Sequence, residues 1–241
     1  MSATIGVSSV ASDFPLHSRR GRWARALLAR RGQVLLGLDP QGRTDLALIR
    51  DTRARTPLLL RDAPALTLLA WARAAAALDG AFAEAGVFMG GSARLICEAK
   101  GAARLHLFDV FDALQEAQPQ LDADARTIAN HFRSVHGPLA HVREQLADYE
   151  GVSFHPGVFP GSAQPVGDER FAFVHIDLDL YHGTRAALAF FWPRMMPGGI
   201  VIGDDYNLPE VRRAFDDHFA DAAQPLTVLP WSQVIAIKSA R

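Results

Sequence analysis

The sequence holds a single cysteine, no long apolar run and almost no net charge, and each shortage excludes a class of protein. Cys97 is alone among 241 residues, which excludes an internal disulfide and a zinc site built from several cysteines. The most apolar long stretch, LTLLAWARAAAAL at 66–78, is interrupted by Arg73 and is too short to cross a bilayer. The formal net charge of −1 argues against nucleic acid or an anionic membrane surface as a partner.

The first residues, MSATIGVSSVASDFPLHSRRGRW, lack the long apolar core that follows the basic start of a signal peptide. A lone cysteine is also typical of a reducing compartment. We therefore expect a soluble protein of the cytoplasm that does not associate with membranes.

Apolar residues in short runs are what the sequence has in quantity. They make up 49% of the chain, enough for the core of one α/β domain with an accessory segment. From about residue 80, helix-like stretches alternate with strand-like runs at 81–88, 104–111, 152–159, 170–177 and 199–205. This alternation predicts a parallel sheet covered on both faces. The last two runs, 224–230 and 232–240, are joined by a link too short for a helix and should pair antiparallel.

The stretch before residue 80 is predicted to be largely helical. Helical spacing occurs at 20–39 and 61–80, with a loop rich in arginine and threonine between them. We expect residues 1–57 to form an N-terminal helical segment, a cap or an oligomerisation element, and residues 58–241 to form the main domain.

Residues 112–137 are a long insertion after the second strand. We expect it to be partly helical, and to form either a lid over a ligand or a plain surface excursion. It carries His131 and His136, which are weak candidates for substrate contact.

The first strand runs into a glycine-rich turn, EAGVFMGGS. Ligands of open α/β sheets bind outside the carboxyl ends of the strands, and glycines there let the backbone approach a ligand and turn into a helix. The turn matches neither the dinucleotide fingerprint GxGxxG nor the phosphate-binding loop GxxxxGK[ST]. A plain tight turn is the structural alternative. The candidate ligand-binding residues are Glu84, Gly86, Gly90, Gly91 and Ser92.

The second strand ends at Asp109, where doubly wound folds place an acid against ribose hydroxyl groups. One acid at a strand end is weak support, but together with the glycine turn it indicates a nucleoside ligand. His155 follows the third strand near the expected place of an adenine ring, which it would contact unless it only fills space.

The fourth and fifth strands both end in carboxylates. Asp177 closes FAFVHID, and Asp204 and Asp205 close GIVIGDD. If the strands are neighbours, the three acids share one edge, which suits a divalent cation such as Mg²⁺ that prefers oxygen ligands. Without a metal, the acids would raise one another's pKa. The alternative is that they cap nearby helices, and we expect that role for Asp179.

Two histidines lie near these acids in the sequence. His175 is inside the fourth strand and is expected to be a hydrogen-bonded core residue. His182 follows the acids directly and is a candidate for proton transfer, unless it faces solvent in the first turn of a helix.

Six segments occur in an order that resembles the macrocin O-methyltransferase (TylF-type) family, between Leu58 and Lys238. They are EAGVFMGGS, FDVFDAL, HPGVFPGS, IDLDLYHGT, MPGGIVIGDDY and VRRAFDDHF. The resemblance implies the class I methyltransferase fold, a Rossmann-like, doubly wound, seven-stranded α/β sheet that ends in an antiparallel hairpin. It also implies an O-methyltransferase that uses S-adenosylmethionine and Mg²⁺ to methylate a hydroxyl group of a small molecule, typically a sugar on a natural product. Such enzymes are expected to form homo-oligomers.

Carried onto this chain, the resemblance assigns a role to each group of site residues. Asp177, Asp204 and Asp205 would hold the metal. The donor would be held by Glu84, Gly86, Gly90, Gly91 and Ser92 at its methionine portion, by Asp109 at the ribose, and by the segment from His155 to Gly157 at the adenine. The chain departs from the family at His182-Gly183-Thr184, where a glutamate is usual, and at Leu58–Leu60.

The implied chemistry needs a base for the substrate hydroxyl, and Asp177 and His182 are the two candidates. A second interpretation takes DLD as the DxD motif of a metal-dependent nucleotide-sugar glycosyltransferase, which leaves the glycine turn, Asp109 and GDDY without roles. A third is a non-catalytic nucleoside-binding scaffold, which has no need of clustered carboxylates that repel one another.

Overall fold

The computed structural model describes residues 19–32, 37–111, 138–220 and 224–239. The chain divides into two compact units, residues 1–44 and 45–241. The predicted insertion at 112–137, with His131 and His136, lies outside the described residues. The predicted domain division at residue 57 stays a prediction. None of the described helices is long and apolar enough to cross a membrane.

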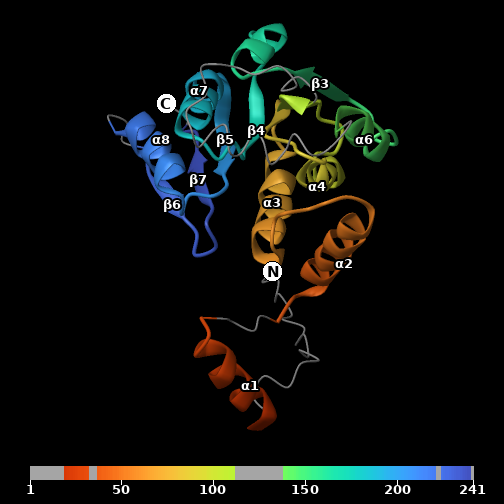
Figure 1. Ribbon diagram of the computed structural model, residues 1–241, viewed down its shortest axis with the longest axis vertical. Coiled ribbons are helices and arrows are strands. Elements are labelled where there is room, and N and C mark those ends of the chain that lie inside the picture. Colours follow the sequence, from red (N-terminus) through yellow and green to blue (C-terminus); the bar gives the residue numbers. More distant parts are fainter. Residues whose placement is uncertain (1–18, 33–36, 112–137, 221–223, 240–241) are drawn as a thin grey trace, which may run out of the picture. The chain divides into compact units, whose positions relative to one another are not determined.

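A seven-stranded sheet with the order β3-β2-β1-β4-β5-β7-β6 forms the centre of the larger unit (Figure 1). The strands are β1 Ala81–Ala85, β2 Leu105–Asp109, β3 Val152–Pro156, β4 Phe171–Ile176, β5 Met195–Gly203, β6 Leu226–Val228 and β7 Val234–Ile237. Strands β1 to β5 run parallel, and β7 is antiparallel to both β5 and β6. The predicted parallel sheet with an antiparallel C-terminal hairpin is confirmed.

Helices cover both faces of this sheet. They are α3 Asp62–Ala75, α4 Gly91–Ala99, α6 Pro138–Gln145, α7 Tyr181–Phe191 and α8 Pro209–Phe219, with short 3-10 turns at Gly161–Val166 and Trp192–Arg194. Successive residues of a strand point to opposite faces. Phe173 of β4 therefore joins the core under α3, α4 and α6, and Val174 joins the core under α7 and α8. The sheet is doubly wound, as the sequence predicted.

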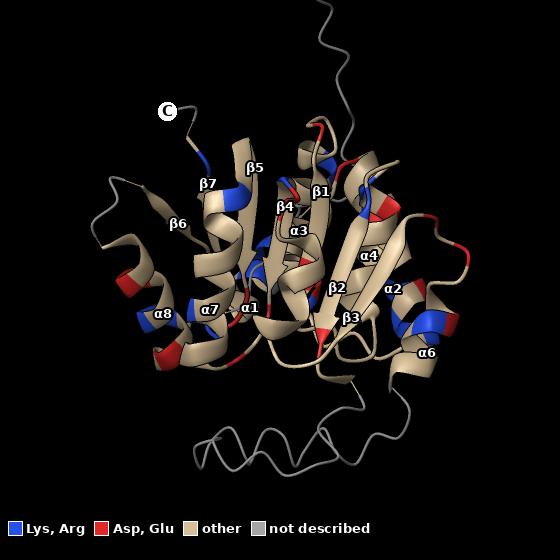
Figure 2. Cartoon of the chain, turned by 90° about the horizontal axis from the view of Figure 1, so that it is seen from above, with Lys and Arg blue, Asp and Glu red and all other residues tan. Residues whose placement is uncertain are grey.

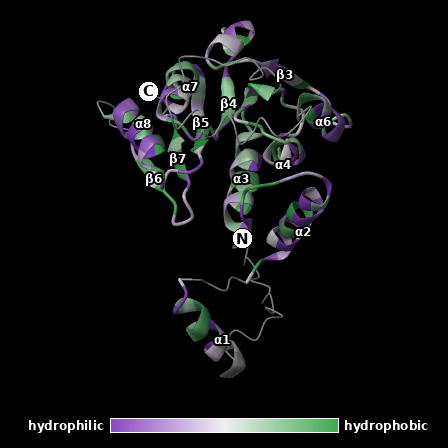
Figure 3. Cartoon of the chain, in the orientation of Figure 1, coloured by the Kyte–Doolittle hydropathy of each residue, from purple (hydrophilic) through white to green (hydrophobic). Residues whose placement is uncertain are grey.

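The strands are apolar along their length because both faces of the sheet are covered. All six residues of β4 are buried. Figure 2 shows the charged residues mainly on helices and loops, and Figure 3 shows apolar strands between helices whose outer faces are hydrophilic. Charged residues that do follow the strands therefore stand out at the carboxyl edge of the sheet.

The segment predicted as a loop before residue 61 is a helix instead, α2 Pro40–Arg55, so that prediction is wrong. Its inner face is fixed by tertiary contacts: Ile49 is fully buried, and Asp45 forms an ion pair with Arg73 of α3 at 2.8 Å. These contacts outweigh the weak helix propensity of its threonines. The preceding helix, α1 Arg19–Ala29, is shorter than the predicted stretch at 20–39.

Candidate active site

Three carboxylates follow the carboxyl ends of β4 and β5. Asp177 comes directly after β4, and Asp204 and Asp205 come directly after β5. The two strands are parallel neighbours with Ile176 opposite Gly203, and the Asp204 N–H donates to the Ile176 carbonyl oxygen at 2.9 Å. Parallel strands in register end at the same edge of a sheet. Asp177 lies in one group with His175 and Asp204 and in another with Asp179 and Asp205, the ligand atoms of each group being within 4.8 Å of one another. The predicted metal-ligating residues Asp204 and Asp205 therefore each lie close to Asp177.

A fourth carboxylate, Asp179, belongs to the same cluster. Oxygen atoms of Asp177, Asp179 and Asp205 lie within 4.8 Å of one another. The prediction that Asp179 caps the following helix is wrong, because Leu180 is the cap residue of α7 and the Asp179 side chain makes no cap hydrogen bond there. Asp179 and Asp205 both adopt a left-handed backbone, with φ of 60° and 51°, which is uncommon outside glycine. The carboxyl groups of these two residues are hydrogen-bonded to each other.

The crowding of these acids raises their pKa values. Burial raises the pKa of Asp177 well above its usual range, and the charge of Asp204 adds to it. Burial also raises the pKa of Asp179. Burial and the hydrogen bond that protonated Asp205 donates to the Asp179 carboxylate raise the pKa of Asp205 to about 6. Such a cluster favours the ionised form of all its members only when a cation joins it.

A chain of buried polar side chains runs beneath the cluster from β1 to β7. Glu84 Oε1 is 2.8 Å from His175 Nδ1, and His175 Nε2 is 3.4 Å from Asp204 Oδ2. Gln233 of the segment before β7 donates to the same Asp204 oxygen at 3.1 Å and to the Pro64 carbonyl oxygen at 3.4 Å. These hydrogen bonds hold the Asp204 carboxylate from below. The expectation that His175 is a hydrogen-bonded core residue is confirmed.

Burial opposes the charged form of His175, but its hydrogen bonds to Asp204 and Glu84 outweigh this and raise its pKa to about 10. His175 Nε2 or Nδ1 also lies within 4.8 Å of ligand atoms of Asp177 and Asp204. The positive histidine thus neutralises part of the negative charge of the cluster.

The glycine turn after β1 follows the predicted path into α4. Gly86 and Gly90 have φ of 91° and 82°, values that favour glycine. A Cβ at Gly86 would lie 1.8 Å from the Asp177 carbonyl oxygen, and a Cβ at Gly91 would lie 2.5 Å from the Pro57 carbonyl oxygen. Close approach of other backbone segments therefore requires both of these glycines. The side chain of Ser92, in the first turn of α4, is buried.

Asp109 ends β2 as predicted and is bonded to the glycine turn. Its Oδ2 accepts the N–H groups of Val87 at 2.6 Å and Phe88 at 2.9 Å, and its Oδ1 accepts the N–H of Phe111 at 3.0 Å. The carboxylate therefore orders the turn, whatever else it binds. Its place at the carboxyl edge, beside the first turn, is the one that the sequence indicated.

His155 was predicted to follow the third strand, but it lies inside β3 and packs on the sheet. Its ring stacks on Phe108 with centroids 4.6 Å apart, and its Nε2 lies 3.0 Å from His106 Nδ1. Burial lowers the pKa of His155. Gly157 follows with φ of 129°, and its N–H donates to the Asp109 carbonyl oxygen at 2.9 Å. His155 thus packs between β2 and β3, and its contact with an adenine stays a prediction.

His182 is exposed in the first turn of α7, and its ring meets the edge of Tyr181 at 5.2 Å between centroids. Within the described part of the chain, the residues grouped around the acids include His175 and not His182. Of the two candidate bases, Asp177 is the one inside the cluster.

Comparison with known proteins agrees with this arrangement. The family model described as macrocin-O-methyltransferase (TylF) matches residues 69–235, more than half of the chain. The chain belongs to this family. The matched span contains the whole candidate site, from Glu84 of the donor-side turn to Gln233 beneath the acids.

The chain is also similar to curated O-methyltransferases. The chain is 33% identical over 156 residues to 8-demethyl-8-(2,3-dimethoxy-alpha-L-rhamnosyl)-tetracenomycin-C 4'-O-methyltransferase of Streptomyces olivaceus, which covers 58% of each chain. It is 29% identical over 158 residues, 59% of each chain, to demethyldecarbamoylnovobiocin O-methyltransferase of Streptomyces niveus. The matched region thus spans less than two thirds of the length of these relatives.

Solved structures of methyltransferases share the fold. The O-methyltransferase NovP superposes with a TM-score of 0.58 at 26% identity, covering 72% of this chain and 80% of NovP. An O-methyltransferase from Bacillus cereus, solved in complex with SAH, superposes with a TM-score of 0.53 at 15% identity, covering 90% and 99%. The second likeness shows the fold alone. The class I methyltransferase fold that the resemblance implied is confirmed.

For three residues of the site, the sequence-based predictions missed either the residue or its role. Gln233 lies directly before β7, and no local pattern marks it as part of the site. Glu84 was assigned to the donor, but its bond to His175 depends on β1 and β4 being neighbours. Asp179 was assigned to a helix cap because its left-handed backbone carries no sequence signal.

Proposed function

We propose that this chain is an S-adenosylmethionine-dependent, divalent-metal-dependent O-methyltransferase that acts on a sugar hydroxyl of a natural product. The observation that carries the proposal is the carboxylate cluster after β4 and β5, at the same edge of the sheet as the glycine turn after β1. Family membership supports the reaction type, since the TylF model is that of an O-methyltransferase.

The donor side fits S-adenosylmethionine. Glu84 is fully buried, and its Oε2 has no hydrogen-bond partner among the described residues. A buried carboxylate oxygen calls for a donor, and the amino group of the methionine portion is one. When bound, the sulfonium of the donor supplies an activated methyl group. Glu84, Gly86, the turn Gly90–Ser92 and Asp109 would hold it, with Gly157 and the packed ring of His155 at the border of the adenine.

The acid cluster fits Mg²⁺ or a similar cation, because its donors are carboxylate oxygens, the ligands that hard divalent cations prefer. Asp177, Asp204 and Asp205 would hold the ion, and Asp179, within 4.8 Å of Asp177 and Asp205, would join them. When bound, the ion would lower the pKa of a substrate hydroxyl.

The roles of the two candidate bases follow from their surroundings. Asp177 directly follows the buried strand β4 and lies inside the acid cluster, so its carboxylate would lie beside a hydroxyl group held at that ion. His182 is exposed on α7 and would act only on a substrate that reaches over the helix. We therefore assign the base to Asp177.

A sugar hydroxyl is the proposed acceptor because one relative is named for a methylation at the 4' position of a rhamnosyl tetracenomycin. Mycinamicin III 3''-O-methyltransferase of Micromonospora griseorubida, 34% identical over 84 residues, is a second natural-product relative. The glycosyltransferase alternative has no support in the family match. The non-catalytic scaffold remains an outcome of the test.

The test is isothermal titration with S-adenosylmethionine, with and without MgCl₂, followed by methyl transfer to the rhamnosyl tetracenomycin acceptor read by mass spectrometry. Wild type should bind the donor and methylate. Asp177→Asn should keep donor binding and lose about 100-fold or more in kcat, the effect of removing a positioned base. His182→Gln, the matched control, should keep its activity.

Full turnover by Asp177→Asn would contradict the assignment of the base. Donor binding without turnover on any hydroxylated acceptor would favour the scaffold. No donor binding under either condition would overturn the proposal, and UDP-sugars with Mn²⁺ would be tested next.

A further inference from the structure

Two tyrosines border the acid cluster, one beside each acid-bearing loop. Tyr206 directly follows Asp205 after β5 and is buried. Tyr181, the half-buried first residue of α7, comes two residues after Asp179. Because each ring is so close to the acids in the chain, whatever holds the ring also restrains the loop.

Helix α8 holds Tyr206 with one arginine and one aspartate. The Tyr206 hydroxyl donates to Asp216 Oδ1 at 2.8 Å, and the guanidinium carbon of Arg212 lies 5.2 Å from the ring centroid. Burial and the bond to Asp216 raise the pKa of Tyr206 to about 12, so its hydroxyl stays a proton donor at neutral pH.

The same helix holds Tyr181 with the next arginine and the next aspartate. The Tyr181 hydroxyl donates to Asp217 Oδ2 at 2.8 Å, and the guanidinium carbon of Arg213 lies 4.1 Å from the ring centroid. Glu210 Oε2 accepts the Tyr181 backbone N–H at 3.5 Å. We call Arg212, Arg213, Asp216 and Asp217, together with the two tyrosines that they contact, the tyrosine clamp.

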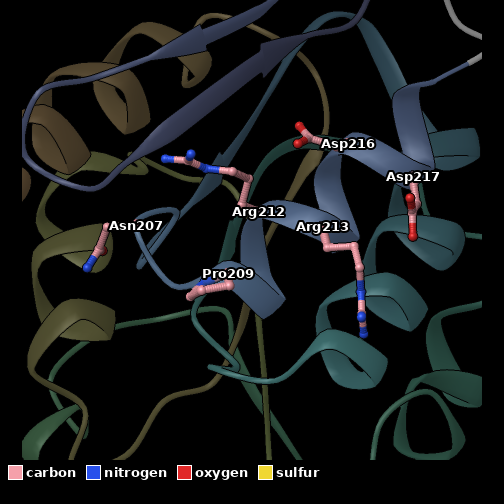
Figure 4. Close-up of a pocket in the computed structure, with 6 residues that line it drawn as sticks. All are labelled: Asn207, Pro209, Arg212, Arg213, Asp216 and Asp217. Carbon is pink, nitrogen blue, oxygen red and sulfur yellow. The ribbon is translucent and has the colours of Figure 1, made fainter.

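The clamp uses the helical repeat twice. Arginine and aspartate four residues apart lie on one side of a helix, so the pair 212/216 serves one tyrosine and the pair 213/217 serves the other. Figure 4 shows Arg212 and Arg213 leaving α8 in different directions. The four charged residues line an open hollow of about 370 Å³ together with Asn207 and Pro209.

Packing of α8 on the sheet does not require these charged side chains. Its apolar face, with Val211, Phe215 and Phe219 buried, provides that packing. The clamp residues of α8 are exposed, and exposed ion pairs add little to stability by themselves. Their contacts go instead to two aromatic rings that adjoin the acids.

We propose that the tyrosine clamp positions the acid cluster: by holding Tyr181 and Tyr206, α8 sets the spacing of the two acid-bearing loops and thereby the affinity for the divalent cation. The proposal rests on the proposed function, in which the acids bind that cation. The clamp residues are positioning residues, since they act through the tyrosines and not on the substrate.

The test measures Mn²⁺ binding by the loss of the free-ion signal in electron paramagnetic resonance. Tyr206→Phe and Asp216→Ala each remove the hydrogen bond between these two side chains and keep the aromatic ring. Each should weaken Mn²⁺ binding about tenfold, the lower end of the loss seen when support of a metal ligand is removed. Binding of S-adenosylmethionine should change by less than about twofold, as for independent sites.

Glu169→Gln is the matched control. It removes one negative charge from an ion pair with Arg104 at 2.9 Å, next to the amino-terminal end of β2 and away from the acids. It should leave Mn²⁺ binding unchanged. The double variant Tyr206→Phe/Asp216→Ala should bind Mn²⁺ no more weakly than either single variant, because both substitutions remove the same hydrogen bond.

Arg213→Lys keeps a cation over the Tyr181 ring and should retain most of the Mn²⁺ affinity, whereas Arg213→Ala should not. Variants with wild-type Mn²⁺ affinity but lowered melting temperature would overturn the proposal and leave the clamp a structural feature. A wild-type protein that binds no Mn²⁺ would overturn both this proposal and the metal part of the proposed function. Normal wild-type binding with unaffected variants overturns this proposal alone.

Discussion

At the scale of single residues, the histidines show how surroundings decide a role. His175 is fully buried between two carboxylates, and its pKa is raised to about 10. His106 is also buried, but its neighbours are His155 and Arg104, and its pKa is lowered to about 4 by burial and then by those two groups. His182 is exposed. In one protein, His175 is thus a charged residue between two carboxylates, His106 a neutral packed residue and His182 a solvent-exposed residue.

His106 should make the free energy of unfolding depend on pH. In the unfolded chain its pKa is near 6.5, and in the folded chain about 4, so the unfolded state takes up a proton first as the pH falls. This contribution is constant above pH 6.5, and stability is lost as the pH falls from 6.5 toward 4. Besides His155 and Arg104, Glu169 faces the ring, with 4.0 Å between His106 Nε2 and Oε1. Urea unfolding at pH 7.5 and pH 5.0 measures how much free energy of unfolding is lost between the two pH values. This loss should be smaller by about 1 kcal/mol in His106→Gln than in wild type.

His182→Gln is the control for this pH dependence, because its side chain is exposed. Its loss of stability between the two pH values should equal that of wild type. An unchanged pH dependence in His106→Gln would show that other groups cause the loss.

At the scale of elements, α8 lies against β5 at a distance that only glycine allows. A Cβ at Gly203 would be 2.3 Å from the tip of the Phe215 ring and 3.1 Å from Val234. Gly203 is also the last residue of β5, directly before the acids. The close contact of helix and strand therefore ends at the site itself.

Gly203→Ala should be destabilising, because the Phe215 ring is fully buried and has no free space to move into. Overpacking of this kind costs about 1–3 kcal/mol in free energy of unfolding. Gly161→Ala is the matched control, since a Cβ there meets nothing within 4 Å. Urea unfolding measures the free energy of unfolding of both variants. Equal values would show that α8 moves away from the added methyl group without loss of stability.

At the scale of the whole molecule, the parallel sheet collects charge that the chain keeps apart. Asp177 and Asp205 come from strands separated by all of α7, yet their oxygen atoms belong to one cluster. The positive charge of His175, inside the sheet, compensates part of the negative charge of the cluster. The pKa values of Asp177 and Asp205 are nevertheless raised, so the compensation is incomplete. A cation is the remaining way to relieve the repulsion.

Mg²⁺ should therefore raise the melting temperature of the wild-type protein. A ligand that binds only the folded state adds about 2.7 kcal/mol of stability at a hundred times its dissociation constant. Differential scanning calorimetry with MgCl₂, against NaCl of equal ionic strength, measures the shift. Asp205→Asn should lose most of it, and an equal shift in NaCl would point to general screening instead.

Much of the fold and part of the site followed from local patterns. Apolar runs and their spacing predicted the sheet and the C-terminal hairpin, because burial on both faces demands continuous apolar strands. The acids Asp177, Asp204 and Asp205 could be found because charge directly after an apolar strand is conspicuous. Helix α2 was missed, since its burial of Ile49 and its pairing of Asp45 with Arg73 are tertiary contacts.

Local sequence patterns are enough to place these residues at the carboxyl edge, because strand ends and their order along the chain are local properties. Which of the residues meet depends on the order of the strands in the folded sheet. The bond of Glu84 to His175 and the hydrogen bond from Gln233 to Asp204 join segments far apart in the chain. The left-handed backbone of Asp179 likewise occurs only in the folded loop. Their physical reason is the strand order, in which β1, β4, β5 and β7 lie side by side although the chain visits other elements between them.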